Sequence, residues 1–129
     1  SPNAKIKYPF SDLGLAPEVG SSFLLFQSLG YQQAAQLLFE SQPIDGNRYH
    51  ELGLAKYVGE DFFDEANKYA HMLKEQSLSS IIETKAILKA FMQEDLAKSR
   101  SMETAAMKKL FGSEDNIKAV EKFFAKNKK

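Results

Sequence analysis

The chain has 129 residues, enough for one hydrophobic core but not for two, and 43% of them are hydrophobic, as in ordinary globular proteins. Its 17 basic and 17 acidic residues cancel, so no long-range field would attract it to nucleic acid or to an anionic membrane. It contains no cysteine, which excludes disulfides, thiolate catalysis and cysteine-ligated metals.

Targeting signals are absent from both ends of the printed sequence. No apolar stretch is long enough to span a bilayer, and the opening SPNAKIKYPF lacks the apolar core of a signal peptide. The closing KNKK is not a peroxisomal address of the Ser-Lys-Leu type. We therefore expect a cytoplasmic location, without membrane or nucleic-acid partners.

The first residues predict one short strand followed by a loop. Apolar residues alternate with lysines up to Pro9, where the strand is expected to end, at Ala4, Ile6, Tyr8 and Phe10. Residues 11–16, which contain Gly14, predict a loop.

Two helices are expected next, separated by Gly30. Pro17 suits a first helical position, which would place Glu18 in the first turn of a helix ending at Gly30. The second helix is expected over residues 31–41. A short helix should follow, capped by Asp45 and closed by Gly53, and then a second brief strand over residues 54–58.

Amphipathic periodicity predicts further helices in the remaining chain. Phe62, Ala66, Tyr69 and Leu73 share one helical face. Separate helices are expected over residues 78–91 and 102–110, and Ser113 should cap the last one. The prediction is thus about six helices and at most two short strands. Two short strands are too few to form a stable sheet by themselves. We therefore expect the chain to be part of a larger domain.

Three segments resemble the crotonase (enoyl-CoA hydratase/isomerase) superfamily, in the order that the family has them. YPFSDLGLAPEVGSS, residues 8–22, resembles its strand–loop–helix segment with Leu-Gly followed by Pro-x-x-Gly. Residues 44–58 resemble its short helix and following strand. LFGSEDNIKAVEKFFAKNK, residues 110–128, resembles its closing helix. Lys118 and Ala119 depart from the usual Glu-Gly pair there, which leaves the coenzyme A (CoA) contacts open.

The resemblance implies an α/β crotonase-like fold of which this chain is the mostly helical C-terminal half. Residues 1–60 would belong to the core and carry the catalytic glutamate, and residues 61–129 would form a helical oligomerisation region. The N-terminal half of the same domain would supply the two oxyanion-hole N–H groups. We therefore expect residues 1–129 alone to be inactive.

The resemblance also implies a reaction. Phe10 stands where hydratases carry a carboxylate, and Glu18 stands where they commonly have glycine. That pattern is similar to the peroxisomal-type Δ3,Δ2-enoyl-CoA isomerases of fatty-acid β-oxidation, in which one glutamate shuttles the proton. Glu18 is thus the candidate catalytic residue, and Phe10, Leu13 and Leu15 are expected to line the acyl pocket around it.

For other residues the prediction of a functional role is weaker. Phe123 and Lys126 match positions that lie beside CoA in the family. The simpler interpretation is that Phe123 is a core aromatic residue and Lys126 a solvated lysine. Glu18 itself could be a charge favoured near a helix N-terminus. His50 and His71 lack the spacing of metal ligands and are expected to be structural.

The expected partners are an acyl-CoA substrate and further copies of the chain, as a trimer or a dimer of trimers. No metal or separate cofactor is expected, because CoA is part of the substrate. Two alternatives remain open. One is another crotonase reaction, such as hydration, if the other half supplies a carboxylate. The other is a non-catalytic interaction domain.

Overall fold

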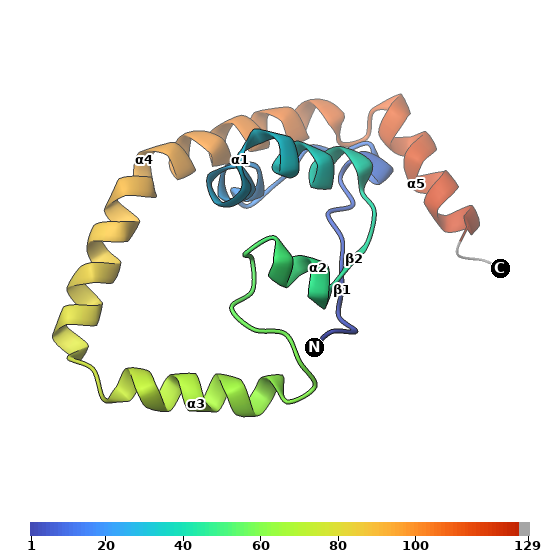
Figure 1. The fold of residues 1–129 in the computed structure, drawn as a ribbon. Coiled ribbons are helices and arrows are strands. Elements are labelled where there is room, and N and C mark those ends of the chain that lie inside the picture. Colours follow the sequence, from blue (N-terminus) through green and yellow to red (C-terminus); the bar gives the residue numbers. More distant parts are fainter. Residues whose placement is uncertain (127–129) are drawn as a thin grey trace.

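The computed structural model describes residues 1–126, which form a compact group of elements and a long helical arm (Figure 1). In chain order the elements are β1 (Lys5–Ile6), the 3₁₀ helix η1 (Ser11–Leu13), α1 (Ser21–Glu40), β2 (Ile44–Asp45), α2 (Gly46–Glu51), α3 (Phe62–Lys74), α4 (Leu78–Leu110) and α5 (Glu114–Lys126). No helix among these residues is both long enough and apolar enough to cross a membrane.

The sheet consists of β1 and β2 alone. The strands pair antiparallel, with Lys5 opposite Asp45 and Ile6 opposite Ile44. The expected strand is therefore shorter than residues 4–9, because only two residues find a partner within the described chain. The prediction of a strand over residues 54–58 was wrong. The Leu54 N–H donates to the Tyr49 carbonyl, so this residue continues the turn that ends α2.

A small core lies beneath α1. Leu25, Ala34 and Leu38 are buried, and partly buried apolar residues pack around them: Tyr8, Phe10, Leu29, Leu37 and Leu54. The helix breaks at Gly30, whose φ of 73° lies outside the helical region, so the expected interruption is confirmed. Asp45 caps α2 as expected, since its side chain accepts the Arg48 N–H at 2.8 Å.

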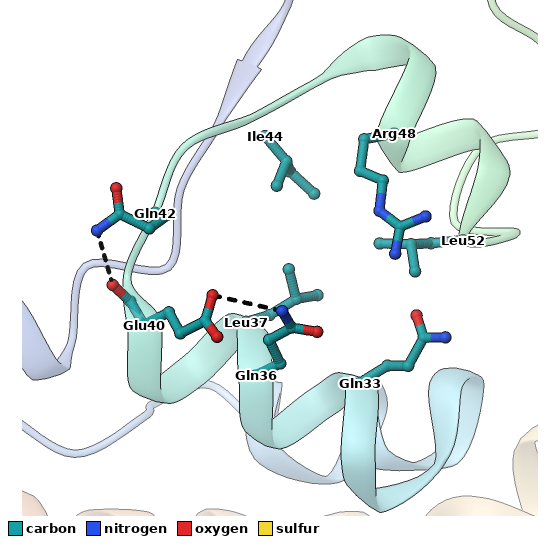
Figure 2. A pocket seen from close by; sticks show the side chains of 8 residues that line it. All are labelled: Gln33, Gln36, Leu37, Glu40, Gln42, Ile44, Arg48 and Leu52. Atoms are coloured by element: carbon teal, nitrogen blue, oxygen red, sulfur yellow. Dashed lines mark hydrogen bonds between the residues drawn. The ribbon is translucent and has the colours of Figure 1, made fainter.

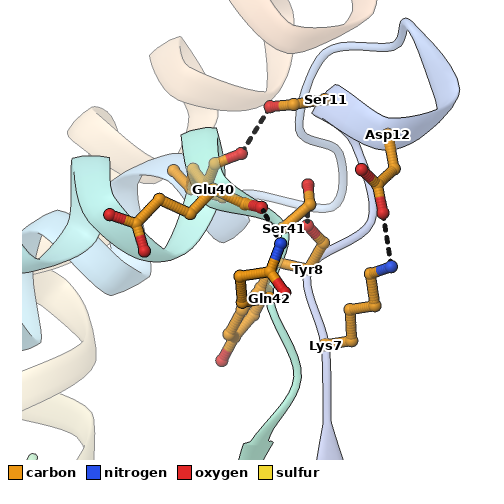
Figure 3. Close-up of polar contacts among 8 residues, drawn as sticks. Lys7, Tyr8, Ser11, Asp12, Glu40, Ser41 and Gln42 are labelled. Atoms are coloured by element: carbon orange, nitrogen blue, oxygen red, sulfur yellow. Dashed lines mark hydrogen bonds and ion pairs between the residues drawn. The ribbon is translucent and has the colours of Figure 1, made fainter.

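Hydroxyl groups join the C-terminus of α1 to the segment that follows β1 (Figure 3). Ser11 donates to the Leu38 carbonyl at 2.6 Å, and Ser41 donates to the Tyr8 carbonyl at 2.9 Å. Ser41 is 1% exposed and ends the helix in the left-handed region. Burial, together with a hydrogen bond to Tyr49, raises the pKa of Tyr8 well above its usual value. These contacts fix residues 8–11 against α1.

One unbroken helix replaces the two expected between residues 78 and 110. Residues 92–101 contain neither glycine nor proline, so nothing in the sequence interrupts the helix there. The second half of α4 packs against α1, whereas its first half and α3 extend away from that core (Figure 1). Five α-helices are therefore described, rather than about six.

Helix α5 returns to η1, where Asn116 holds it in place. The Asn116 side chain is 6% exposed; it donates to the Leu13 carbonyl at 2.6 Å and accepts the Gly112 N–H at 2.9 Å. Ser113 accepts the Asn116 N–H at 3.2 Å, so the predicted cap of the last helix is confirmed. Helix α5 thus contacts η1 and α4 contacts α1, on either side of the loop that contains Glu18.

Candidate functional site

Glu18 lies in an exposed turn before α1, not in the first turn of a helix. The helix begins at Ser21, four residues later than Pro17, because Val19 and Gly20 adopt φ angles of 61° and 83° and interrupt any helix there. A valine in the left-handed region is strained, at a cost of roughly 1–3 kcal/mol. The predicted helix start was therefore wrong, and a strained backbone adjoins Glu18 instead.

A buried carboxylate from α4 holds this turn. Glu103 is 6% exposed, and its Oε2 accepts the Gly20 N–H at 2.6 Å. Its Oε1 accepts the Ser22 N–H at 2.9 Å and the Ser22 hydroxyl at 2.6 Å. The first N–H groups of a helix lack partners within the helix, and an acceptor carrying negative charge suits them. Glu103 therefore caps α1 from 83 residues along the chain.

Gly20 fits this contact because it has no side chain. A Cβ atom built on Gly20 would collide with Cδ1 of Leu96, a neighbour on α4. Its positive φ also disfavours other residues. The turn after Glu18 is thus tightly packed against α4.

Glu18 lines an open cavity of about 300 Å³ between this turn and α4. The other lining residues are Val19, Arg100, Glu103, Thr104, Met107 and Lys108. Within the described part of the chain, no ion pair or side-chain hydrogen bond holds the Glu18 carboxylate. An acid in this position is free to reach a ligand in the cavity.

The apolar residues expected around Glu18 lie elsewhere in the described chain. Phe10 packs against the core under α1, and neither it nor Leu13 nor Leu15 lines the Glu18 cavity. Leu13 instead presents its carbonyl to Asn116. All three are half-buried. The structure therefore brings none of them together with Glu18, and their role in binding an acyl chain stays a prediction.

Phe123 lines a second cavity, of about 410 Å³, between α5 and the start of η1. Three lysines share this cavity, namely Lys7, Lys118 and Lys122. Lys7 forms an ion pair with Asp12, and Lys118 pairs with Glu114 at 2.5 Å. An aromatic ring beside several ammonium groups suits a flat base carrying phosphates. The side chain of Lys126, the other predicted residue, lies outside the described residues.

A smaller cavity lies between the end of α1 and α2 (Figure 2). Its volume is about 70 Å³, well below the roughly 300 Å³ at which ligand pockets begin. Gln33, Gln36 and Glu40 face Arg48 across it, and Gln36 donates to Glu40 at 3.5 Å. Its size excludes it as an acyl-CoA site.

Both histidines lie on the exposed surface. His50 contacts the Ala55 carbonyl through Nδ1 at 2.8 Å, and His71 lies exposed on α3. No cluster of three metal-ligating side chains occurs within residues 1–126.

Sequence reasoning did not select Glu103 or the lysines near Phe123. One signal for Glu103 was present: it lies at helical spacing from Leu96, Ala106 and Leu110, on the less exposed face of α4. An acid among core-facing residues needs a partner. No sequence pattern could have identified that partner as the Gly20 turn.

The sequence profile described as enoyl-CoA hydratase/isomerase matches residues 1–129. YhaR of Bacillus subtilis, named for enoyl-CoA hydratase/isomerase, is 26% identical over 126 residues, which is 96% of this chain and 49% of YhaR.

Solved structures give a similar result. OdaA of Pseudomonas aeruginosa superposes with a TM-score of 0.85 at 32% identity, over 95% of this chain and 51% of OdaA. The enoyl-CoA hydratase/isomerase of Pseudoalteromonas atlantica T6c superposes with a TM-score of 0.86 at 26% identity, over 95% of this chain and 50% of that protein. The crotonase-like fold is confirmed. The chain spans about half the length of the relatives that it matches.

Proposed function

The chain belongs to the enoyl-CoA hydratase/isomerase family, and we propose that it shifts the double bond of 3-enoyl-CoA thioesters, with Glu18 moving the proton. The observation that carries this proposal is the position of Glu18. Its carboxylate lines a cavity of about 300 Å³ and is the acid there whose oxygens are not already bonded to the protein. A base must reach the proton that it removes, and a position in the wall of a cavity supports this role for Glu18.

The reaction needs one carboxylate and no water. Glu18 takes a proton from C2 of the 3-enoyl thioester, and the electrons of that C–H bond form a dienolate whose negative charge rests on the thioester oxygen. The same carboxyl group returns the proton at C4, which leaves the double bond between C2 and C3. A Glu18 carboxylate with no bonded partner in the described chain allows one acid to reach both carbons.

Hydration is the competing reaction, and it commonly uses a second carboxylate to hold the water. Phe10 occupies that position in the resemblance and packs into the core. A phenyl ring can neither activate water nor donate a proton, so these residues favour isomerisation.

We propose that the oxyanion is held by a further part of the same domain. The matched relatives are about twice as long as this chain, and the crotonase resemblance places the two N–H donors in the N-terminal half. Removing one such donor typically lowers kcat about 10²- to 10³-fold. Residues 1–129 alone are accordingly expected to be inactive.

The cavity beside Phe123 is the proposed site for the CoA end of the substrate. Its lysines suit phosphates, and the ring of Phe123 offers a face to an adenine. Lys126 would add a further cation, as the resemblance implies.

Residues 61–129 are proposed to be the oligomerisation region. Large apolar side chains on the arm are exposed, among them Phe63, Leu78, Leu88 and Phe91. A group of exposed apolar side chains commonly marks an interface. Further copies of the chain, as a trimer or a dimer of trimers, would cover them.

Product analysis of the complete enzyme tests the reaction. With 3-hexenoyl-CoA we expect 2-hexenoyl-CoA, and with 2-hexenoyl-CoA we expect little conversion to the 3-hydroxy product, as measured by liquid chromatography and mass spectrometry. If water addition exceeds the double-bond shift, the hydratase alternative is correct. If neither substrate is turned over, the protein is an interaction domain or acts on another thioester.

A further inference from the structure

Glu103 is a buried acid that the proton shuttle does not use. It is 6% exposed and lines the same cavity as Glu18. Both of its oxygens are occupied: Oε2 by the Gly20 N–H, and Oε1 by the N–H and hydroxyl of Ser22. Ser99 adds a longer contact to Oε1 at 3.4 Å. A carboxylate with every oxygen engaged is poorly suited to exchanging protons with a substrate.

The turn that Glu103 holds is also closed by a backbone hydrogen bond, in which the Ser21 N–H donates to the Glu18 carbonyl at 3.0 Å. α1 has no side-chain cap of its own, because Gly20 occupies the capping position. Val19 lies at a φ of 61°, which a β-branched residue adopts only when its surroundings impose it. The hydrogen bonds from Gly20 and Ser22 to Glu103 begin one residue after this strained position. Together with the backbone hydrogen bond from Ser21 to Glu18, they hold this conformation.

We propose that Glu103 is a positioning residue for Glu18. By fixing Gly20 and Ser22 it sets the path of the Val19 backbone, and so the direction in which the Glu18 side chain enters the cavity. This inference rests on the proposed function of Glu18. A catalytic group displaced by about 1 Å loses about 10²-fold in rate, so loosening the turn should reduce turnover more than substrate binding.

Two substitutions in the complete enzyme separate the role of the carboxylate from that of packing. Glu103→Gln keeps the size of the side chain and one oxygen, but it turns an amide N–H₂ toward one of the bound donors. We expect kcat to fall about tenfold, with KM within about twofold of the native value. Glu103→Ala removes every acceptor, and kcat should fall about 10²-fold. Glu94→Gln, an exposed acid on the same helix, is the matched control and should leave kcat unchanged.

Hydrogen exchange at residues 18–22 gives a second readout that is independent of activity. Loss of Glu103 should speed exchange of the Gly20 and Ser22 amides about tenfold or more, because each loses its acceptor. Ser22→Ala removes one donor and retains the carboxylate, so it provides a milder variant should Glu103→Ala fail to fold. Its kcat should lie between those of the native enzyme and Glu103→Gln.

The outcomes are distinct. Lower kcat at constant KM, with faster exchange at residues 18–22, supports the positioning role. Native kcat in Glu103→Gln, with only a lower melting temperature, overturns it, because the contact is then merely structural. If Glu18→Gln is fully active, the proposed function fails, and hydrogen exchange at residues 18–22 becomes the test of the Glu103 contact. Faster exchange in Glu103→Gln then supports a clamp on the turn, and unchanged exchange overturns it.

Discussion

Replacing Glu18 with glutamine in the complete enzyme is expected to lower kcat for isomerisation about 10²- to 10⁴-fold, the usual contribution of a positioned base. Glutamine has the same shape but cannot accept the C2 proton. KM should change little, because Glu18 is one exposed residue in a cavity whose other lining groups remain. Steady-state kinetics with 3-hexenoyl-CoA measures both quantities.

The stability of this variant should be nearly native. Glu18 has no bonded side-chain partner in the described chain, and substitutions at such surface positions usually change the free energy of unfolding by less than about 0.5 kcal/mol. Glu94→Gln, which also removes one exposed acid, serves as the control. Unchanged kcat in Glu18→Gln would mean that Glu18 is only a turn residue, and the isomerase proposal would fail.

The second large effect is expected on assembly. Leu88 and Phe91 on α4 are 58% and 79% exposed, and α3, the other helix of the arm, has no extensive contact with another described element (Figure 1). Burying a leucine or phenylalanine contributes roughly 1.5–3 kcal/mol. Changing both to lysine should therefore weaken association by at least about 3 kcal/mol per subunit, or roughly 10²-fold. Sedimentation velocity at several concentrations would show the shift toward smaller species.

Lys89→Glu is the matched control for this experiment, because it changes a charge between the two apolar positions. It should leave the assembly largely intact. If Leu88→Lys with Phe91→Lys also leaves the sedimentation unchanged, another part of the same polypeptide covers the arm, and residues 61–129 are not the oligomerisation region.

Local signals in the sequence predicted local structure well. Asp45 and Ser113 cap the helices that they were expected to cap, and Gly30 interrupts a helix as expected. Each of these depends on contacts within a few residues. The single helix α4 was missed because two apolar runs were taken for two helices, although no breaker separates them.

The candidate site could be predicted only in part. The family resemblance selected Glu18, and the structure places it at a cavity. The conformation of Val19 and Gly20 depends on Glu103, which lies 83 residues from Gly20 along the chain, so no local pattern could reveal it. The same holds for Phe10, for which the alternation predicted a strand and the family resemblance a place in the acyl pocket, but whose ring packs beneath α1.

A structure of the complete enzyme with a bound 3-enoyl-CoA analogue would test the role of Glu18 most directly. We predict that one Glu18 carboxylate oxygen lies within about 3–3.5 Å of C2 and can reach C4 on the same face of the acyl chain. A carboxylate turned toward solvent, with the acyl group bound elsewhere, would contradict the assignment.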